Sequence, residues 1–430
     1  MGLITITTQP SGGTYYKGAT VRLYCYATTS GGTVNYSWHG NGSLPYTGSG
    51  SVCRISSDTP GSSTFVCNVT DTTGGSKSSN SASVTILDTP KPAVTVSGGG
   101  TIYRGGSVAV SCEAAVTAGE LTYDWQVSST GSSWSSTGET RANMSPSSAD
   151  VGTKYYRCVV TNELNEYTKS TTSETLTVTV LDTPAPTFSS TDLSDATYYR
   201  GDSPVSSFSA SGNSTSGTIT YTWQSSTNGS SWSNISGATG TSYTPSVANA
   251  GVTYYRCVIT NRLYGYAKSA TSSVATITVN DTPLPEFTSS YDVSNASYYV
   301  GQSASNLVAT STSDSGIISY KWQKSTDMTT WTDISQSAAY KPPTTTEGVA
   351  YYRCIVTNTL NGYSKSVTSG TAVITVIEQS KPTITADPSN KSCYRGDSGV
   401  SISVSATGAG TLTYQWQSSS DYDTWTNISG

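Results

Sequence analysis

Apolar and polar residues alternate with a period of two along this chain, in short runs. In Leu-Thr-Tyr-Asp-Trp (121–125) every second residue is apolar or aromatic, so these side chains fall on one side of an extended chain. The same alternation occupies 108–112, 156–160 and 175–180. Turn-forming residues separate the runs, and no stretch has helical periodicity. The pattern predicts an all-β protein of short strands, with Asn361-Gly362 as a two-residue hairpin turn.

The strand pattern itself repeats. A Trp-Gln pair recurs at intervals of 94 to 99 residues. A Tyr lies two residues before the Trp of each pair, and a second Trp lies nine residues after it. Tyr-Tyr-Arg-Cys comes 32 to 34 residues after three of these pairs. The first tryptophans are Trp125, Trp223, Trp322 and Trp416, with Trp38 in a similar place, and the second are Trp134, Trp232, Trp331 and Trp425. A third marker, Tyr-x-Gly, appears in each repeat, at Tyr16, Tyr103, Tyr199, Tyr299 and Tyr394. Three markers in constant order predict a tandem array of one module of about 97 residues.

Asp-Thr-Pro-x-Pro segments at 88–92, 182–186 and 281–285 separate the modules, and the joint near 380–382 is looser. Paired prolines remove backbone donors and favour extended conformations, so each joint is short and semi-rigid. We therefore expect an elongated rod, on the order of 150–200 Å long. The predicted modules are repeat 1 (1–88), repeat 2 (89–182), repeat 3 (183–281), repeat 4 (282–379) and repeat 5 (380–430).

Repeat 5 is predicted to be incomplete. It ends at Gly430, which matches Gly237 halfway through repeat 3, and it lacks the Tyr-Tyr-Arg-Cys strand. Half a sandwich exposes an apolar face and open strand edges. We expect either that the chain is part of a longer protein or that another chain completes repeat 5 by strand addition. At the other end a strand is predicted almost directly after Met1, with no signal-peptide pattern before it. We expect that a leader was either replaced or never used.

The order of Cys, Trp and Tyr-x-Cys resembles the immunoglobulin (Ig) fold, in which these residues lie on strands B, C and F. Repeat 2 carries all four, as Cys112, Trp125, Tyr156 and Cys158. The resemblance implies an Ig-like β-sandwich in each repeat, with Trp packed on a B–F disulfide and the Tyr hydroxyl bonded to backbone. Residues 221–260 resemble the bacterial Ig-like modules of surface and adhesin-type proteins, which also decorate virions of tailed phages. An extracellular place on a bacterial cell or a virion is implied.

Two disulfides are implied by the same resemblance, Cys25–Cys67 and Cys112–Cys158, each contributing about 2–4 kcal/mol if formed. Reduced cysteines that only fill the core are the alternative. The strand-B cysteine lies seven residues after the Gly of Tyr-x-Gly in repeats 1 and 2. The same count in repeats 3 and 4 gives Phe208 and Val308, so we expect an apolar side chain in place of the cysteine there. Cys257 and Cys354 are then without a partner, and Cys53 and Cys393 are also left over.

Composition excludes several functions. The chain has 22 Lys and Arg against 27 Asp and Glu, a net charge of -5, which argues against a nucleic-acid partner. No apolar run approaches about 18 residues, so no membrane span is predicted. The single histidine, His39, is predicted to lie in a loop, and the acids are scattered. We therefore predict no enzyme, no catalytic residue, no metal and no cofactor.

Several aromatic and charged residues are candidates for binding. We expect both tryptophans of each repeat to pack inside the sandwich, with sugar stacking as the alternative. Tyr264, Tyr266 and Tyr363 are better candidates, because they lie near the hairpin between strands F and G, at a module end. Arg-Gly-Asp at 200–202 and 395–397 is interpreted as the turn before strand B, with integrin-type adhesion as the alternative.

Charged residues near the joints also recur. The linker aspartates Asp88, Asp182 and Asp281 are predicted to cap the local backbone, with calcium binding as the alternative. Lys169, Lys268 and Lys365 follow the F–G turns and are interpreted as solvated edge charges. These lysines could also serve as isopeptide donors.

These features favour a non-enzymatic structural or adhesive stalk or fibre on a bacterial cell surface or a phage virion. Its partners would be a host-surface protein or glycan, or other virion or surface proteins. The alternative is a carbohydrate-binding accessory region of a larger surface enzyme.

Overall fold

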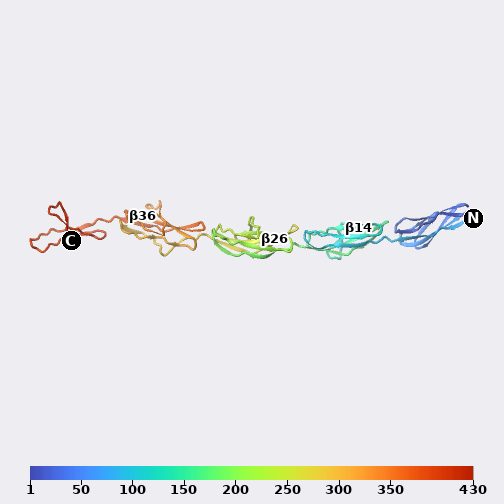
Figure 1. The fold of residues 1–430 in the computed structure, drawn as a ribbon, viewed down its shortest axis with the longest axis horizontal. Coiled ribbons are helices and arrows are strands. Elements are labelled where there is room, and N and C mark those ends of the chain that lie inside the picture. Colours follow the sequence, from blue (N-terminus) through green and yellow to red (C-terminus); the bar gives the residue numbers. More distant parts are fainter. Residues whose placement is uncertain (430) are drawn as a thin grey trace. The chain divides into compact units, whose positions relative to one another are not determined.

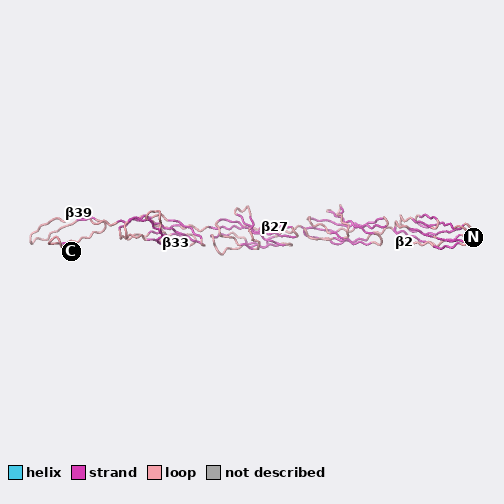
Figure 2. The backbone as a smooth tube through the Cα atoms, turned by 90° about the horizontal axis from the view of Figure 1, so that it is seen from above, coloured by secondary structure: helices cyan, strands magenta, loops and turns pink. Residues whose placement is uncertain are grey.

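The computed structural model describes residues 1–429, and among them it contains strands, turns and loops but no helix (Figure 2). The all-β prediction is confirmed. Backbone contacts divide the chain into two compact units. Unit 1 comprises Met1–Ser190, Ala210–Thr222 and Cys257–Ser272, and unit 2 comprises Thr191–Ser209, Trp223–Arg256 and Ser273–Gly430. The boundaries predicted for the five repeats remain a prediction.

Unit 1 contains repeat 1, which has two main sheets and one separate strand pair. One has the order β2-β10-β8-β5 with β9 beside β8, and the other has the order β3-β7-β6, while β1 pairs with β4. The strands are β1 (Ile4–Thr8), β2 (Gly13–Tyr16), β3 (Val21–Tyr24), β4 (Tyr26–Thr29), β5 (Val34–Gly42), β6 (Tyr46–Ser49), β7 (Val52–Ile55), β8 (Gly61–Asp71), β9 (Ser76–Ser78) and β10 (Ala82–Leu87).

Repeat 2, also in unit 1, has the same design. Its larger sheet has the order β12-β19-β17-β14-β15 with β18 beside β17, and its smaller sheet has the order β11-β13-β16. The strands are β11 (Ala93–Gly98), β12 (Gly100–Tyr103), β13 (Val110–Ala115), β14 (Glu120–Ser128), β15 (Ser135–Ser136), β16 (Asn143–Met144), β17 (Gly152–Leu164), β18 (Tyr167–Thr172) and β19 (Leu176–Leu181). In unit 1 the end of β26 (Gly251–Leu263) also pairs with β27 (Tyr266–Thr271).

Repeat 3 is divided between the two units, and its residues in unit 2 are 191–209, 223–256 and 273–281. There β28 lies parallel to β21 and antiparallel to the start of β26, and β22 pairs with β25. The strands not yet given are β20 (Thr187–Asp192), β21 (Ala196–Tyr199), β22 (Phe208–Asn213), β23 (Thr218–Ser226), β24 (Ser233–Asn234), β25 (Ser242–Tyr243) and β28 (Ala275–Asn280).

Repeat 4 lies wholly in unit 2. Its larger sheet has the order β30-β38-β36-β33-β34 with β37 beside β36, and β29 pairs with β32 and β31 with β35. The strands are β29 (Glu286–Phe287), β30 (Ala296–Tyr299), β31 (Leu307–Val308), β32 (Ser311–Thr312), β33 (Ile317–Ser325), β34 (Thr332–Ser335), β35 (Ala339–Tyr340), β36 (Gly348–Leu360), β37 (Tyr363–Thr368) and β38 (Ala372–Ile377). The long strands β14, β26 and β36 are labelled in Figure 1.

Repeats 1, 2 and 4 are Ig-like β-sandwiches. Strand C (β5, β14, β33) lies beside strand F (β8, β17, β36) in one sheet, and strand B lies in the other. Each has its own buried core between the two sheets. Repeat 3 has the same strand order along the sequence and the same parallel first-to-last pairing. The prediction of tandem Ig-like sandwiches is confirmed.

Residues 380–429 contain two short strand pairs, β39 (Thr383–Ala386) with β40 (Ser405–Thr407) and β41 (Gln417–Ser418) with β42 (Thr426–Asn427). Their apolar side chains are not buried, and Trp425 and Ile428 are exposed. That repeat 5 is incomplete, and that another chain completes it, both stay predictions.

The first tryptophan of each complete repeat lies in the core, as predicted. Trp125 on β14 is 0% exposed and stands opposite Cys158 of β17 in the strand register. Trp38, Trp223 and Trp322 are buried in the same way. Alternation with period two explains this. Every second residue of strand F faces the core, and Cys158, which stands opposite Trp125, is one of these buried residues.

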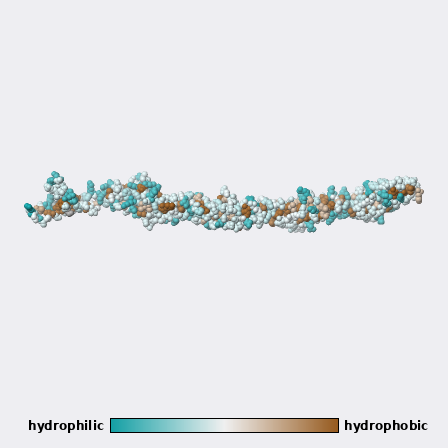
Figure 3. All heavy atoms as spheres, in the orientation of Figure 1, coloured by the Kyte–Doolittle hydropathy of each residue, from teal (hydrophilic) through white to brown (hydrophobic). Residues whose placement is uncertain are grey.

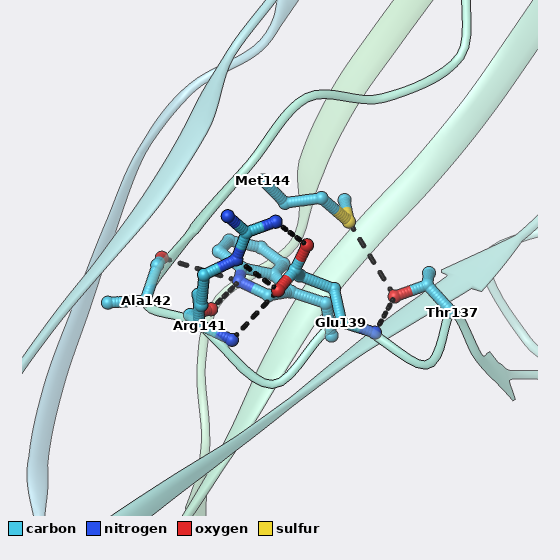
Figure 4. A network of polar contacts seen from close by, with 6 residues as sticks. Thr137, Glu139, Arg141, Ala142 and Met144 are labelled. Carbon is cyan, nitrogen blue, oxygen red and sulfur yellow. Dashed lines mark hydrogen bonds and ion pairs between the residues drawn. The ribbon is translucent and has the colours of Figure 1, made fainter.

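A loop closes over the Trp125 indole. The indole N–H donates to the backbone oxygens of Arg141 and Ala142, at 3.1 and 3.3 Å. Figure 4 shows the Arg141 guanidinium facing the Glu139 carboxylate, with two N–O distances of 2.9 Å. These hydrogen bonds lower the pKa of Glu139 to about 2. Polar contacts therefore fix the loop that supplies acceptors for the buried indole.

The second tryptophan of each repeat is not in the core, so that prediction was wrong. The arginine guanidinium of Tyr-Tyr-Arg-Cys lies over its ring, at 4.0 to 4.3 Å. The pairs are Arg157 with Trp134, Arg256 with Trp232, and Arg353 with Trp331. The reason is local: Trp134 lies in the turn before β15, and Arg157 alternates with the buried Tyr156 and Cys158, so it points outward.

The expected replacements for the strand-B cysteine were also wrong. A tyrosine hydroxyl on strand C accepts a hydrogen bond from the end of strand B, at Ala27, Gly212 and Ser311 in repeats 1, 3 and 4. Cys25 lies two residues before Ala27, so the matching residues are Ala210 and Ala309. The segment between the turn glycine and strand B is longer in repeats 3 and 4 than in repeat 1, by two residues and by one. A fixed count therefore gave Phe208 and Val308.

Three smaller expectations have different outcomes. Asn361 and Gly362 have φ of 50° and 82°, which confirms the two-residue hairpin turn. His39 lies in strand β5, not in a loop. The Tyr156 hydroxyl makes no hydrogen bond to the described backbone, so the implied corner bond was wrong. The strand-C tyrosines Tyr36, Tyr221 and Tyr320 accept a backbone N–H instead.

The two tryptophan positions predict unequal mutational costs in repeat 4. Trp322→Ala leaves a large cavity and should lower the free energy of unfolding by about 3–5 kcal/mol. Trp331→Ala removes a surface cation–ring contact and should cost about 1 kcal/mol or less. The check is the denaturant midpoint for chemical modification of the buried Cys354 thiol, identified by peptide mass spectrometry. Equal shifts for the two variants would contradict the assignment.

Candidate functional site

A positively charged side chain of one repeat lies over a tyrosine ring of the next at three successive joints. The cation precedes the turn glycine before strand B, and the tyrosine begins the strand after the F–G turn. We call this the joint contact. It comprises Lys17 over Tyr167 at 4.2 Å, Arg104 over Tyr266 at 4.3 Å, and Arg200 over Tyr363 at 4.0 Å. The first two pairs lie within unit 1 and the third lies within unit 2.

Hydrogen bonds reinforce two of the three joint contacts. The Asn165 amide donates to the Lys17 backbone oxygen at 3.0 Å, and Asn361 donates to the Arg200 backbone oxygen at 3.1 Å. Asn361 also donates to the Asp202 carboxylate at 2.6 Å. Tyr264 occupies the matching turn position in repeat 3, so the joint between repeats 2 and 3 lacks the amide bond.

The turn glycine lets the two backbones approach. Gly18, Gly105 and Gly201 all have φ of 81°, a conformation that L side chains rarely adopt. A Cβ on Gly18 would lie 2.5 Å from the Asn165 backbone oxygen, and one on Gly105 would lie 2.8 Å from Cβ of Tyr264. Glycine is therefore required both by the turn and by the neighbouring hairpin.

The linkers after repeats 1, 2 and 3 are each anchored to the following repeat by an ion pair. The lysine after the F–G turn contacts the linker aspartate at 2.9 Å, as Lys169–Asp88, Lys268–Asp182 and Lys365–Asp281. The hydrogen bond from the lysine holds the pKa of each aspartate below its usual value. The other carboxylate oxygen accepts the next backbone N–H, which confirms the predicted capping. The lysines are thus paired residues, not merely solvated edge charges.

A buried asparagine on strand F holds the linker from inside. Its side-chain amide donates to a linker proline oxygen at 2.9 Å and also to a carbonyl in the loop before strand C. The residues are Asn162 to Pro90, Asn261 to Pro184, and Asn358 to Pro283. All three asparagines are fully buried, so the linker is bonded to the interior of the following repeat.

The three tyrosines predicted to bind a partner lie at these joints. One face of Tyr266 and one face of Tyr363 are covered by arginine, while Tyr264 remains 61% exposed in its turn. A role for Tyr264, Tyr266 and Tyr363 in binding a partner stays a prediction.

The first Arg-Gly-Asp segment is a turn, as predicted, and both of its charged side chains are engaged. Arg200 lies over Tyr363, and Asp202 accepts bonds from Asn361 and from the Tyr199 backbone N–H. The sequence alone indicated only a turn here and no contact between repeats. One signal was available: Lys or Arg precedes the glycine in repeats 1 to 3, each of which is followed by an F–G tyrosine.

The cysteines of each predicted disulfide lie next to each other as thiols. All eight cysteines of the chain are free thiols in this structure, and seven of them are buried. The thiols of Cys25 and Cys67 share a hydrogen bond, as do those of Cys112 and Cys158, so each candidate pair is adjacent. Burial raises the pKa of Cys67 and of Cys158 to about 12. The two disulfides stay predictions.

Within residues 1–429, no group of three His, Cys, Asp or Glu side chains is arranged to hold a metal ion. The same residues include no helix long and apolar enough to cross a membrane.

The profile of a domain of unknown function, DUF8696, matches residues 194–281 and 292–378. No curated protein matches this chain. Similar solved structures include the titin I-band fragment I67–I69 (14% identity, 64% of this chain, 98% of that chain, TM-score 0.28). Drosophila N-cadherin EC1-4 is another (14% identity, 80% of this chain, 92% of that chain, TM-score 0.26). A third comprises three N-terminal domains of the bacteriophage RB49 Highly Immunogenic Outer Capsid protein, Hoc (13% identity, 67% of this chain, 99% of that chain, TM-score 0.24).

The Lys365–Asp281 ion pair predicts a measurable acid dependence. Because the folded-state pKa of Asp281 is lowered, the pair stabilises the joint above the unfolded-state value of about 4, and this stabilisation is lost as the pH falls through the folded-state pKa. Carboxyl NMR titration should show the pKa of Asp281 rising in Lys365→Gln and staying low in the control Lys341→Gln. An unchanged pKa in Lys365→Gln would show that the ion pair does not form in solution.

Proposed function

We propose that this chain is a non-enzymatic spacer, a stalk or fibre whose Ig-like repeats are held in a defined order and orientation. The observation that carries the proposal is the joint contact, which recurs at three joints with a lysine or arginine over a tyrosine ring each time. A string of sandwiches on loose tethers has no need of such contacts. Their recurrence is best explained if the angle between neighbouring repeats matters.

The size of the interactions supports limited bending. A cation–ring contact contributes about 0.5–2 kcal/mol, and a hydrogen bond about 0.5–1.5 kcal/mol. Where both occur, at the joints of repeat 1 with repeat 2 and of repeat 3 with repeat 4, they amount to a few times the thermal energy, enough to keep the joint closed most of the time. The linker prolines add stiffness, because they restrict the backbone whether or not the contact forms. The array would therefore act as a semi-rigid spacer.

The surface suits display in solvent. Charged residues make up 11% of the chain, and the exposed faces are rich in Ser and Thr. Figure 3 shows a mostly white to teal surface with small brown patches. Such a surface resists nonspecific association. We propose an extracellular place, on a bacterial cell surface or on a phage virion.

The joint contacts can be tested by small-angle X-ray scattering of the full chain. Wild type should have a maximum dimension on the order of 150–200 Å. Lys17→Gln/Arg104→Gln/Arg200→Gln should shorten and broaden the distance distribution, because the joints open. Lys77→Gln/Lys154→Gln/Lys324→Gln removes the same charge outside the joints and should behave as wild type. A compact wild type, or a joint variant that scatters identically, would refute the spacer.

The place of display can be tested separately. Antibodies raised against repeats 3 and 4 should label intact cells or intact virions of the source in electron microscopy. Labelling that requires permeabilised cells, and is absent from virions, would contradict display at either surface.

A further inference from the structure

The outer face of one sheet in repeat 1 carries two arginines side by side. Arg22 of β3 and Arg54 of β7 are direct partners in the antiparallel register, so both side chains leave the same face. The next pair on this face is Tyr24 with Val52, and Tyr26 follows beyond the Cys25 position. We call Arg22, Tyr24, Tyr26 and Arg54 the repeat 1 face.

The repeat 1 face does not belong to the repeated scaffold. The strand-C tyrosine hydrogen bonds align strand B of repeats 1, 3 and 4, and the B-strand cysteines align repeat 2. On this alignment small or uncharged residues mostly replace the arginine and tyrosines of strand B. They are Ala109, Ser111 and Glu113 in repeat 2, Ser207, Ser209 and Ser211 in repeat 3, and Asn306, Val308 and Thr310 in repeat 4.

The two arginines have no acidic partner. None of the ion pairs formed by residues 1–429 includes Arg22 or Arg54. Both line a surface hollow of about 470 Å³, and the acid on its rim, Asp58, accepts hydrogen bonds from Ser56 and Tyr167. Like charges directly opposite in a sheet destabilise it. Folding alone therefore gives no reason for this pair, whereas a bound anion would.

The aromatic half of the face supplies flat apolar contact. The Tyr24 and Tyr26 rings are stacked, with centroids 6.3 Å apart and planes 20° apart, and they remain 40% and 45% exposed. Tyrosine combines an apolar ring with a polar hydroxyl, which suits the faces and hydroxyls of sugar rings. Guanidinium groups bind carboxylate and sulfate through paired N–H donors.

We propose that the repeat 1 face binds an acidic oligosaccharide, with Arg22 and Arg54 on its carboxylate or sulfate groups and the tyrosines on its sugar rings. The five residues from Arg22 to Tyr26 span about 13 Å of extended chain, which requires more than a monosaccharide. A nucleic acid fits less well, because its charge density calls for many cations and the chain has a net charge of -5. The site goes beyond the spacer function, which would stand without it.

Isothermal titration calorimetry of the full chain can test this site with three probes: hexagalacturonate, a heparin-derived hexasaccharide and neutral cellohexaose. At least one acidic probe should bind, with an affinity that falls as NaCl is raised, and the neutral probe should not. Arg22→Gln/Arg54→Gln should weaken binding roughly tenfold to hundredfold, because charge-assisted hydrogen bonds are lost. Tyr24→Ala should also weaken it.

Controls separate this loss from other effects. Arg22→Gln/Arg54→Gln should melt at or above the wild-type temperature, because it removes a like-charge pair. Lys154→Gln/Arg262→Gln removes equal charge elsewhere and should bind normally. Arg104→Gln/Arg200→Gln, which opens joints, should also bind normally, so failure of the spacer is distinguishable. The proposal is overturned if neither acidic probe binds, if the double arginine variant binds as wild type does, or if short single-stranded DNA binds as tightly.

Discussion

Period-two alternation on strand F is the constraint on which both the core and the joints depend. In β17 of repeat 2, Tyr156, Cys158 and Val160 are buried in turn, and the next residue of the same parity is the buried Asn162. The first three fill the sandwich, while Asn162 bonds the linker. A few residues later the same strand ends at the hairpin that meets the preceding repeat. One strand therefore connects the Trp125 core to the joint, and the position of the joint follows from the register of the core.

This connection explains why the joints differ in detail yet keep their geometry. At the joint between repeats 2 and 3, Tyr264 replaces the asparagine of the turn, but Arg104 still lies over Tyr266. In repeat 4 the uncharged Val300 precedes the turn glycine, where repeats 1 to 3 have lysine or arginine. Each joint has its own set of polar bonds on a common backbone arrangement. Sequence can therefore adjust the stiffness of individual joints without altering the sandwiches that hold them.

Sequence reasoning was reliable where a local rule decides. Alternation placed Trp125 inside, and Asn361-Gly362 was recognised because both residues tolerate positive φ. It failed where loop length or distant partners decide. Trp134 follows Trp125 by a fixed interval, but the turn between them carries it to the surface. Likewise, nothing near Arg200 in the sequence reveals Tyr363, because the contact exists only after two repeats have folded and met.

Repeat proteins allow a distinction that single domains do not. A side chain present in every copy, such as the tryptophan of strand C, is explained by the sandwich that all copies share. A side chain present in one copy must be explained by something that copy does alone. The Arg22–Arg54 pair is of the second kind, and a like-charge pair across strands costs about 0.2–1 kcal/mol. Functional sites are where local rules of stability are commonly broken, so repeat 1 differs from its neighbours in the way a binding surface would.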